Sequence, residues 1–468
     1  MTDIPGFHAH PSWSPDAKFI AYENYQDGHS SICILPATGG TPVWCGPDTM
    51  EAFEPDWFTL NPGRVLAFTG RTGVHTDIFT INLETAQITN LTNTAGLDER
   101  DGTFSPDGKR VAYSVKQNGY TWMHSIPVSG EDAQTLASSQ GERPEWSPDG
   151  SWLAGVFQPD PGQSYLLFSP ANQQVLSPAA LWVPGRIEGM TWTSAALGNP
   201  MPEWILSLSA AGLLTMPTPA PAGAPLSEQL VRLDIKAPDP RLSSAVVDRF
   251  NALRQAVKLQ VGWDYLGILD SAAMDLRTPL PPRELLSWFR TGRAFAISTD
   301  AVRKGLLVVV PDVIGSSEYW RLYLRAAKQD GTQGEPLREL PWDFDDRTSG
   351  TPTAFDNGGQ FYAAIPQGFY IDLTQLAADF GWQRRPSDAD WRSYYYSIRY
   401  WEFLSPDGLD WFTAMGELYP PKEFLTPTPS ASPTARPTMR WGPAPTNTRR
   451  PTRTRTPTKT PTPTPTPP

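Results

Sequence analysis

Residues that could carry out hydrolytic chemistry are unevenly distributed along the chain. The segment 240–424 contains no histidine. All of the histidines lie before residue 125: His8, His10, His29, His75 and His124. A hydrolytic zinc site needs about three protein ligands and an open position for water, and a serine triad needs a histidine base. The segment 240–424 therefore cannot supply a histidine-based site by itself, and it contains no Gly-x-Ser-x-Gly nucleophile elbow.

Carboxylates are the remaining candidates for metal or acid–base chemistry. Asp343, Asp345 and Asp346 alternate like cation ligands, but the glycine and the bidentate glutamate of a calcium loop are missing. Asp410 and Glu417 are better explained by helix capping than by acid catalysis. The sequence therefore predicts no catalytic residue, no metal and no cofactor. A relocated hydrolytic site stays an alternative, and it would use one of three acidic side chains as ligand or base: Glu402, Asp300 or Asp264.

Aromatic and basic residues are dense near the end of the same segment. A strand over 395–403 would place alternate side chains on one face, so Tyr394, Tyr396 and Tyr400 could share it. With arginines nearby, such a face would suit glycan or peptide binding. The alternative is a mixed core and edge strand. The candidate ligand-binding residues are Ser287, Arg293, Tyr394, Tyr396, Arg399, Trp401 and Glu402.

The run 287–296, Ser-Trp-Phe-Arg-Thr-Gly-Arg-Ala-Phe-Ala, resembles the zinc-site motif of the D-Ala-D-Ala carboxypeptidase-type (VanY-like) metallopeptidases. That motif reads Ser-x-His-x-x-Gly-x-Ala-x-Asp, and its His and Asp bind zinc. Ser287, Gly292 and Ala294 match the frame, whereas the two ligand positions hold Phe289 and Ala296.

Two later segments extend this resemblance. The run 377–382 matches a family helix that ends in Gly-Trp, and the run 399–402 corresponds to the last motif, Glu-x-Trp-His. The position of the catalytic Glu holds Arg399, and that of the third zinc ligand holds Glu402. The resemblance implies a peptidase-like fold that has lost its zinc ligands. The alternative is an unrelated α+β domain in which Gly292 and Ala294 are packing residues.

Helices and strands are both expected in this segment. An apolar stripe at helical spacing predicts a helix over 244–261, with Ser243 or Ser244 as N-cap. The other predicted elements are a short helix through Met274, strands over 306–310 and 320–324, a helix over 373–380 and a strand over 395–403.

The first half repeats one unit. Trp13-Ser-Pro-Asp16, Phe104-Ser-Pro-Asp-Gly-Lys109 and Trp146-Ser-Pro-Asp-Gly150 are copies, with a weaker copy at Pro55-Asp56-Trp57. Each is followed by a short apolar strand, and the spacing of roughly 40–50 residues is that of one β-propeller blade. The repeats resemble the TolB-like propeller family over residues 9 to about 175, with a degenerate fifth blade at Met190–Met216. The resemblance implies a protein-docking platform, or a gating domain of serine peptidases.

The residues of the repeat have a local structural role. Pro and Asp-Gly make a tight turn, and the aromatic residue before it is expected to pack between blades. The repeated Asp is expected to serve the turn rather than a ligand. Because fewer blades are visible than the six or more of similar propellers, we expect either a natural start upstream, which could include an export signal, or irregular closure.

Composition bounds the compartment and the partners. The chain has 468 residues and a net charge of −11, and its last 43 residues carry seven Lys or Arg and no acid. The body is thus strongly acidic, which argues against nucleic-acid binding. No run of about 18 apolar residues is present, and the first residues lack a signal-peptide pattern. Cys33 and Cys45 face each other across a predicted hairpin, so a disulfide and two buried free thiols are both open.

The tail of the chain alternates Thr and Pro, which predicts an extended, disordered segment. Such tails resemble glycosylated or wall-crossing stalks of secreted proteins, and an inert linker is the alternative. We therefore expect a mainly β protein with a propeller of about 5–6 blades, followed by an α+β domain and a disordered tail. The predicted boundaries are 1–222 for the propeller, 223–239 for a linker, 240–424 for the α+β domain and 425–468 for the tail.

The expected function is that of a secreted or cell-envelope scaffold. Its propeller would dock a protein partner, and its inactive peptidase-like domain would bind wall peptide or glycan. An active cell-wall hydrolase with a relocated site is one alternative. Another is a propeller that supplies all of the function, with the second domain as a structural cap.

Overall fold

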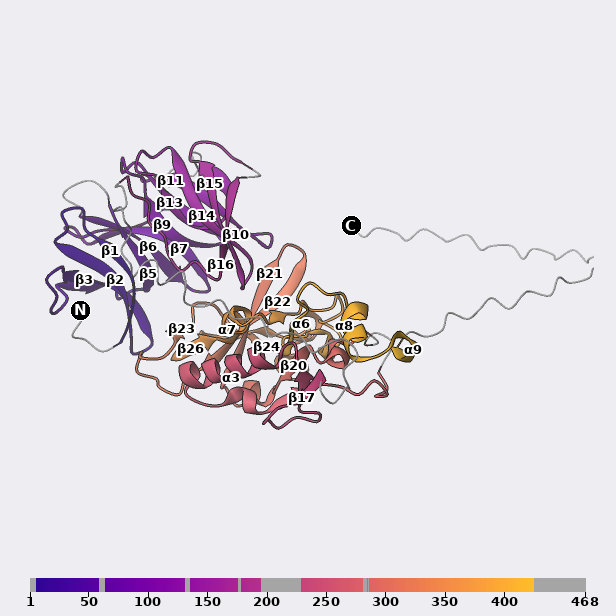
Figure 1. Ribbon diagram of the computed structural model, residues 1–468. Coiled ribbons are helices and arrows are strands. Elements are labelled where there is room, and N and C mark those ends of the chain that lie inside the picture. Colours follow the sequence, from indigo (N-terminus) through magenta and orange to yellow (C-terminus); the bar gives the residue numbers. More distant parts are fainter. Residues whose placement is uncertain are drawn as a thin grey trace, which may run out of the picture. The chain divides into compact units, whose positions relative to one another are not determined.

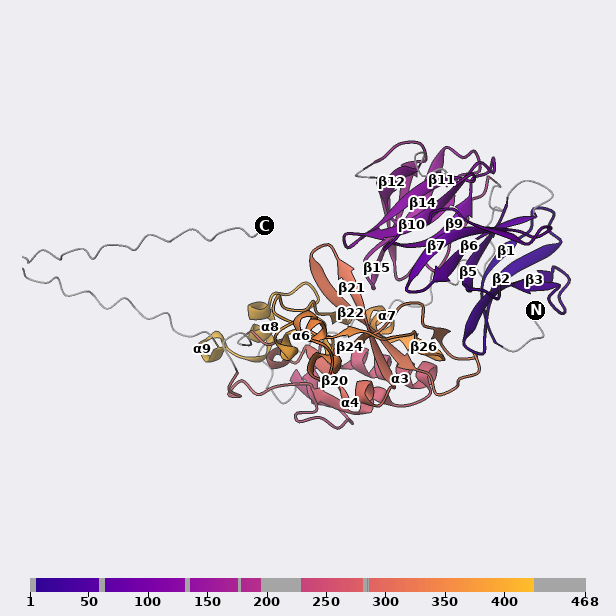
Figure 2. The same cartoon turned by 180° about the vertical axis from the view of Figure 1, so that it is seen from behind.

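The structure, a computed structural model, describes residues 6–58, 64–130, 135–175, 178–194, 229–280, 284 and 286–424. Its first part consists of antiparallel four-stranded sheets that follow one another along the sequence (Figures 1 and 2). Within each sheet the strands pair in sequence order, as in the blades of a propeller. The described residues form four such sheets: β1 (Phe7–Trp13), β2 (Phe19–Gln26), β3 (His29–Pro36) and β4 (Trp44–Gly46); β5 (Glu51–Trp57), β6 (Val65–Thr72), β7 (His75–Asn82) and β8 (Gln87–Asn90); β9 (Asp98–Phe104), β10 (Arg110–Gln117), β11 (Tyr120–Pro127) and β12 (Leu136–Gln140); β13 (Glu142–Trp146), β14 (Trp152–Asp160), β15 (Gln163–Pro170) and β16 (Ala179–Pro184).

The Ser-Pro-Asp turns between the first two strands of a blade share one hydrogen-bond pattern. The Ser105 hydroxyl donates to Asp107 Oδ1 at 2.7 Å and accepts from the Arg110 N–H at 3.0 Å. The Lys109 N–H donates to the same Asp107 oxygen at 3.1 Å. The copies at Ser14 and Ser147 repeat these contacts. The repeated Asp therefore closes its own turn, as the sequence predicts.

The aromatic residue before most of these turns packs against the preceding blade. Trp57 is 6% and Trp146 7% exposed, and their indole N–H groups donate to the carbonyl oxygens of Ser12 at 3.0 Å and Thr103 at 3.2 Å. Trp13, by contrast, is 57% exposed. The prediction that it packs between blades is wrong for the described residues, because no described blade precedes its sheet.

The described residues beyond β16 continue the repeat geometry for one more step. The Phe104 N–H donates to Asp56 Oδ2 of the preceding blade at 2.9 Å. The Trp192 N–H donates in the same way to the carboxylate of Glu145. Trp192 thus contacts Glu145 as Phe104 contacts Asp56, and the degenerate blade at Met190–Met216 stays a prediction. Most of that predicted blade lies outside the described residues.

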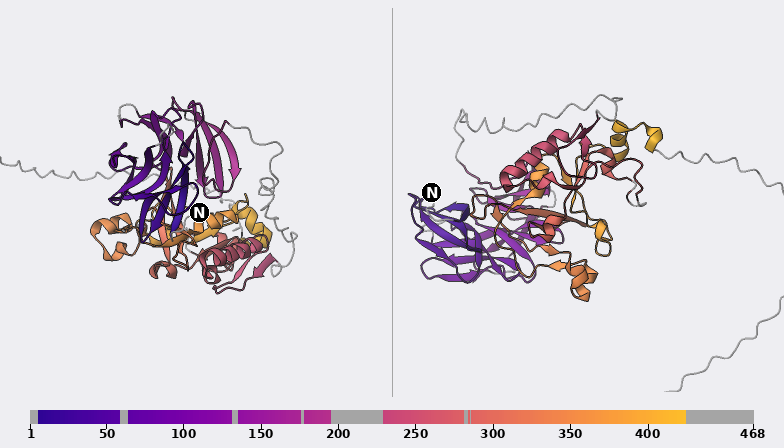
Figure 3. Two further views of the ribbon diagram at one scale, coloured as in Figure 1. Left: turned by 90° about the vertical axis from the view of Figure 1, so that its left-hand side faces the viewer. Right: turned by 90° about the horizontal axis from the view of Figure 1, so that it is seen from below.

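The second part of the described chain combines helices with short sheets, of which Figure 3 gives two further views. Two of its sheets have four strands, in the orders β19-β20-β28-β27 and β21-β22-β26-β23. Its strands are β17 (Leu230–Arg232), β18 (Arg241–Ser243), β19 (Leu269–Ser271), β20 (Ala294–Ile297), β21 (Leu307–Ile314), β22 (Ser317–Arg325), β23 (Glu335–Pro336), β24 (Trp342–Asp343), β25 (Gln360–Phe361), β26 (Phe369–Asp372), β27 (Gln383–Arg384) and β28 (Glu402–Leu404). Its helices are α3 (Val247–Val261), η2 (Tyr265–Gly267), η4 (Trp288–Thr291), α4 (Asp300–Arg303), α5 (Asp346–Ser349), α6 (Pro352–Asn357), α7 (Leu373–Asp379), η5 (Tyr395–Ser397), α8 (Trp411–Leu418) and α9 (Pro421–Phe424).

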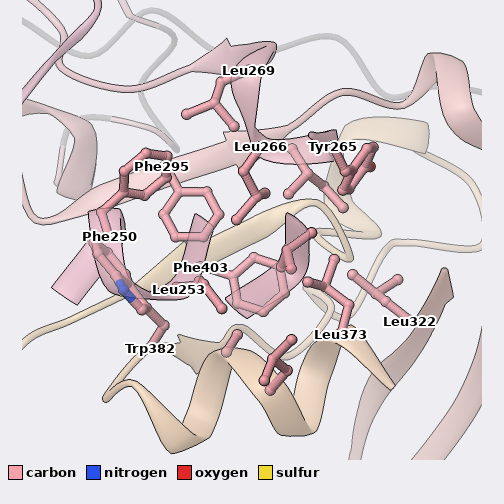
Figure 4. Close-up of a cluster of buried hydrophobic side chains, with 14 of the residues drawn as sticks. Phe250, Leu253, Tyr265, Leu266, Leu269, Phe295, Leu322, Leu373, Trp382 and Phe403 are labelled. Carbon is pink, nitrogen blue, oxygen red and sulfur yellow. The ribbon is translucent and has the colours of Figure 1, made fainter. Parts of the chain in front are cut away.

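An apolar core joins α3 to the β19-β20-β28-β27 sheet and to α7 (Figure 4). The ring of Phe295 lies 5.2 Å from that of Phe250, 4.7 Å from that of Trp382 and 5.2 Å from that of Phe403, measured between centroids. All four side chains are buried, which holds β20 and β28 in a fixed position beneath the candidate site.

Several predicted elements are confirmed and others need correction. The helix over 247–261, the strands over 307–314 and 317–325 and the helix over 373–379 lie where the sequence predicts them. The N-cap of α3 is Val246, without a side-chain cap, rather than Ser243 or Ser244. The predicted helix through Met274 is instead the turn η2 followed by β19.

Residues at the predicted linker are partly structured. β17 pairs with β18, and Leu233 joins the core of the second part, so this fold includes residues before 240. Cys33 and Cys45 are register partners in β3 and β4 and form a disulfide. The Thr/Pro-rich tail, 425–468, lies outside the described residues. Among the described helices, none has the length and apolar character that crossing a membrane would require.

Candidate functional site

The three positions that the peptidase motif would use for zinc lie on neighbouring elements. Ala296 in β20 and Glu402 in β28 are directly opposite each other in an antiparallel pair. Phe289 lies in η4, the turn that leads through Gly292 into β20. Gly292 has φ +64, and a Cβ there would come within 2.8 Å of the Ser243 nitrogen, so the glycine is needed for the close approach of these two segments.

A group of ion pairs surrounds Glu402, in which Glu402 and Arg399 are buried and the other members are partly exposed. Arg399 Nη1 lies 2.9 Å from Glu402 Oε1, and Arg399 Nη2 lies 2.9 Å from Asp388 Oδ2 and also contacts Glu284. Arg385 Nη1 lies 2.8 Å from the other carboxylate oxygen of Glu402. We call these five residues the Arg399 cluster. One guanidinium thus receives three carboxylates from separate parts of the chain.

Arg399 is constrained in both backbone and charge. Its φ of +64 is unusual for a residue with a side chain, and the residue is only 4% exposed. Burial by itself lowers the pKa of the Arg399 guanidinium, but the hydrogen bond to Glu284 and the charge of Glu402 outweigh it and raise that pKa. A permanently charged arginine has no proton to exchange near neutral pH. It therefore cannot act as a general base.

Two other candidate ligand-binding residues have structural contacts. Arg293 is 2% exposed and binds both Asp407, at 2.8 Å, and Glu417, at 3.0 Å. These contacts connect the start of β20 to the segment after β28 and to α8. Ser287 is also buried, and its carbonyl oxygen accepts from the indole N–H of Trp411 at 3.0 Å. Both side chains are therefore too enclosed to form an open binding surface.

The aromatic candidates split into an exposed and a buried set. Tyr394 and Tyr396 are 39% and 61% exposed, with ring centroids 5.6 Å apart. Tyr400 is buried, and Trp401 stacks on Tyr395 at 5.5 Å. The predicted strand over 395–403 is wrong, because η5 covers its first residues and the positive φ of Arg399 interrupts the rest. Tyr394 and Tyr396 still lie together on the surface, but Tyr400 does not share their face.

The other carboxylates considered for metal or acid–base chemistry have local partners. Asp264 binds Arg254 at 2.6 Å, and Asp300 binds Arg303 three residues later. Asp410 caps α8 by accepting from two backbone N–H groups. Asp345 and Asp346 begin α5. Within the described residues, no group of three or more His, Cys, Asp or Glu side chains is arranged to hold a metal ion.

Three members of the Arg399 cluster were not candidates in the sequence: Glu284, Arg385 and Asp388. Glu284 lies 115 residues before Arg399, whereas Arg385 and Asp388 lie 14 and 11 residues before it, and no local motif marks any of the three. Charged residues in Pro-rich loops are common, so only the fold identifies them.

The first part of the chain matches a known family. The family model described as the TolB beta propeller domain covers residues 5–177. The N-terminal part of this chain is a TolB-like β-propeller. That match covers the described strands from β1 to β15 and ends just before β16, the last strand of the fourth blade.

Curated and solved relatives match between 27% and 38% of the chain. The uncharacterized protein Atu1656 of Agrobacterium fabrum is 27% identical over 131 residues, which are 27% of this chain and 42% of that protein. The Tol-Pal system protein TolB of Bordetella pertussis is 26% identical over 150 residues, or 32% of this chain and 33% of that protein. The matched region thus spans less than half the length of these relatives. The crystal structure of TolB from Acinetobacter baumannii is 20% identical over 38% of this chain and 44% of that chain, with a TM-score of 0.32.

Proposed function

We propose that this protein is a secreted or cell-envelope binding and scaffold protein. Its TolB-like propeller docks a protein partner, and its second domain, residues 240–424, is a catalytically inactive peptidase-like domain that binds wall peptide or glycan. The match of residues 5–177 to the TolB beta propeller domain supports the docking role. A relative that matches this region is named for the Tol-Pal system, which supports the proposed location at the cell envelope.

The observation that carries the inactive assignment is the Arg399 cluster. Where the resembled motif has a catalytic Glu, this chain has a buried arginine with a positive φ. Where the motif has zinc ligands, this chain has Phe289, Ala296 and a Glu402 that two arginines neutralise. A fixed guanidinium beside Glu402 repels a divalent cation. The domain is therefore built to hold its fold rather than a metal.

Two further observations support an oxidising, extracytoplasmic compartment. Cys33 and Cys45 are joined by a disulfide, and such bonds persist mainly outside the reducing cytosol. The Thr/Pro-rich composition of 425–468 is typical of stalks on secreted proteins.

The surface that supports ligand binding is the exposed tyrosine pair, Tyr394 and Tyr396. Tyrosine offers a flat apolar ring with a polar tip, which suits sugar rings and peptide bonds. Arg392, two residues before Tyr394, lies over the ring of Trp391 at 4.5 Å and forms an ion pair with Glu318. We therefore expect Tyr396→Ala to weaken binding to a soluble muropeptide about tenfold or more. Phe361→Ala, which removes an exposed ring elsewhere in the same domain, serves as the matched control.

The test is a titration of the purified chain with muropeptide, together with an assay for released D-Ala in the presence of added zinc. Saturable binding without D-Ala release is the expected result. D-Ala release that requires zinc would overturn the inactive assignment. Binding that is absent, or equal in the two variants, would overturn the ligand role of the tyrosine pair.

A second candidate function is that of a structural cap on the propeller. It is favoured by the contact of Arg338, in the second domain, with Glu23 in the propeller at 3.0 Å. A chain ending near residue 222 would then keep the partner affinity of the whole protein.

A further inference from the structure

The second domain contacts the propeller where hairpins join the second and third strands of the blades. Gly315, between β21 and β22, donates its N–H to the Gly119 carbonyl of the third blade at 3.0 Å. Gln375 Nε2 in α7 donates to the Pro161 carbonyl of the fourth blade at 2.7 Å. The Ser-Pro-Asp turns lie at the other end of the same strands. One end of the blades is therefore engaged by the chain itself.

One arginine of the second domain reaches strands of the first three blades. Arg338 lies between β23 and β24, and its Nη2 is 3.0 Å from Glu23 Oε2 in β2. Its guanidinium carbon is 5.4 Å from the centroid of the Phe53 ring in β5. Its main-chain carbonyl accepts from the side chain of Arg71, and from Arg100 Nη2 at 3.2 Å. Both the side chain and the backbone of Arg338 are thus recognised.

The carboxylates of this region need a cation. The side chain of Glu23 is 0% exposed, and a buried carboxylate is costly unless it is paired. Its only other charged neighbour by contact in the described residues is His10, at 3.1 Å. Burial by itself raises the pKa of Glu54, but the charges of Arg338 and Arg100 outweigh it and lower that pKa to about 2. Arg338 and His10 beside Glu23, and Arg338 and Arg100 beside Glu54, favour the charged forms of the two acids and lower their pKa values.

We propose that the first three blades of the propeller together form an arginine-binding site. Glu23 binds the guanidinium, the Phe53 ring lies against its face, and Arg71 and Arg100 bind the carbonyl of the same residue. In this chain the occupant is Arg338 of the second domain. The assignment does not depend on whether that domain resembles a peptidase or binds cell-wall fragments.

The geometry favours arginine over lysine. A planar guanidinium can donate to a carboxylate and at the same time stack on an aromatic ring, whereas an ammonium is a point charge with a tight hydration shell. Because two arginines also bind the carbonyl, the site recognises an arginine within a loop rather than a free cation. An outside partner that uses this site must displace Arg338 and present an arginine of its own.

Chemical rescue tests the site in the full chain. Arg338→Ala should lower the melting temperature by about 5–10 °C, because it leaves buried acids unpaired. Millimolar N-acetyl-argininamide should restore part of that loss, whereas N-acetyl-lysinamide and sodium chloride at equal ionic strength should not. Wild type and Arg303→Ala, which removes an exposed arginine of the same domain, should show no response to either compound. Equal rescue by both compounds, or a variant that melts like wild type, would overturn the proposal.

A second variant covers the case in which Arg338→Ala does not fold. Arg338→Lys keeps the charge but loses the planar fork, so it should fold, melt between wild type and Arg338→Ala, and respond to N-acetyl-argininamide more weakly. In Arg338→Lys/Glu23→Gln the response should disappear, since the acid that receives the guanidinium is neutral. Persistence of the response in that double variant would show that the compound binds elsewhere.

Discussion

Replacing Arg399 tests whether the Arg399 cluster holds the second domain together. Arg399→Ala removes one cation from three carboxylates, of which Glu402 is 4% exposed. Removing one partner of a buried ion pair costs about 3–5 kcal/mol. Glu402 keeps Arg385 at 2.8 Å, which places the expected loss at the lower end. Arginine and alanine at φ +64 carry the same backbone strain, about 1 kcal/mol relative to glycine, so this strain adds nothing to the expected loss.

The assay is urea unfolding followed by tryptophan fluorescence. Because glycine tolerates the positive φ at this position, Arg399→Gly should be about 1 kcal/mol more stable than Arg399→Ala, although both lose the same contacts. Glu402→Gln should lower the free energy of unfolding less in the Arg399→Ala background than in wild type. The coupling energy between the two substitutions should be about 1–2 kcal/mol. Arg303→Ala, at an exposed pair, should change stability by less than about 0.5 kcal/mol. An Arg399→Ala protein within about 1 kcal/mol of wild type would refute the view that the cluster holds the domain together.

Three further outcomes are expected in the propeller. Burial raises the pKa of Asp56 to about 6, although hydrogen bonds from its neighbours lower it. As pH rises, the unfolded chain loses this proton before the folded chain does, so the free energy of unfolding falls by up to about 3 kcal/mol between about pH 4 and 6. Asp56→Asn should flatten this pH dependence of stability in melts across the same range. Joint replacement of Cys33 and Cys45 by Ser opens a loop with a sequence separation of 12 and should lower the free energy of unfolding by about 3 kcal/mol. Reductant should then no longer change the melting temperature. A change that remains would contradict the disulfide between these two residues. Trp57→Phe should destabilise the protein by about 1–2 kcal/mol, because it loses the indole hydrogen bond and contact area. Trp13→Phe, at an exposed position, should be nearly neutral in the same urea unfolding assay. Equal losses in the two variants would contradict the difference in burial.

Local patterns in the sequence predicted the blades well. Each Ser-Pro-Asp turn is held by contacts within five residues, such as Ser105 with Asp107 and Arg110. Such contacts depend little on the rest of the fold. The pairing of Cys33 with Cys45 also follows from the length of one hairpin. The exposed Trp13 is the exception, since its burial depends on a neighbouring blade rather than on its own repeat.

The candidate site was predicted less well. Strand periodicity near 395–403 failed because Arg399 adopts a positive φ, which nothing in its local sequence requires. Arg293 was expected as a ligand-binding residue, yet Asp407 and Glu417 enclose it. A charged residue can bind a ligand or a distant part of its own chain, and residue type does not distinguish these cases.

The sequence alone determined the repeat, the turn chemistry, the facing positions of Cys33 and Cys45 and the absence of histidine from the second domain, since each depends on residue identity or on contacts a few positions apart. The tertiary structure alone decided where charges pair. Arg338 meets Glu23 across 315 residues, and Arg399 meets Glu284 across 115. Coulomb attraction between buried groups depends on distance in space and on exclusion of water. Neither quantity is present in the order of the residues, so these clusters become visible only when the chain is folded.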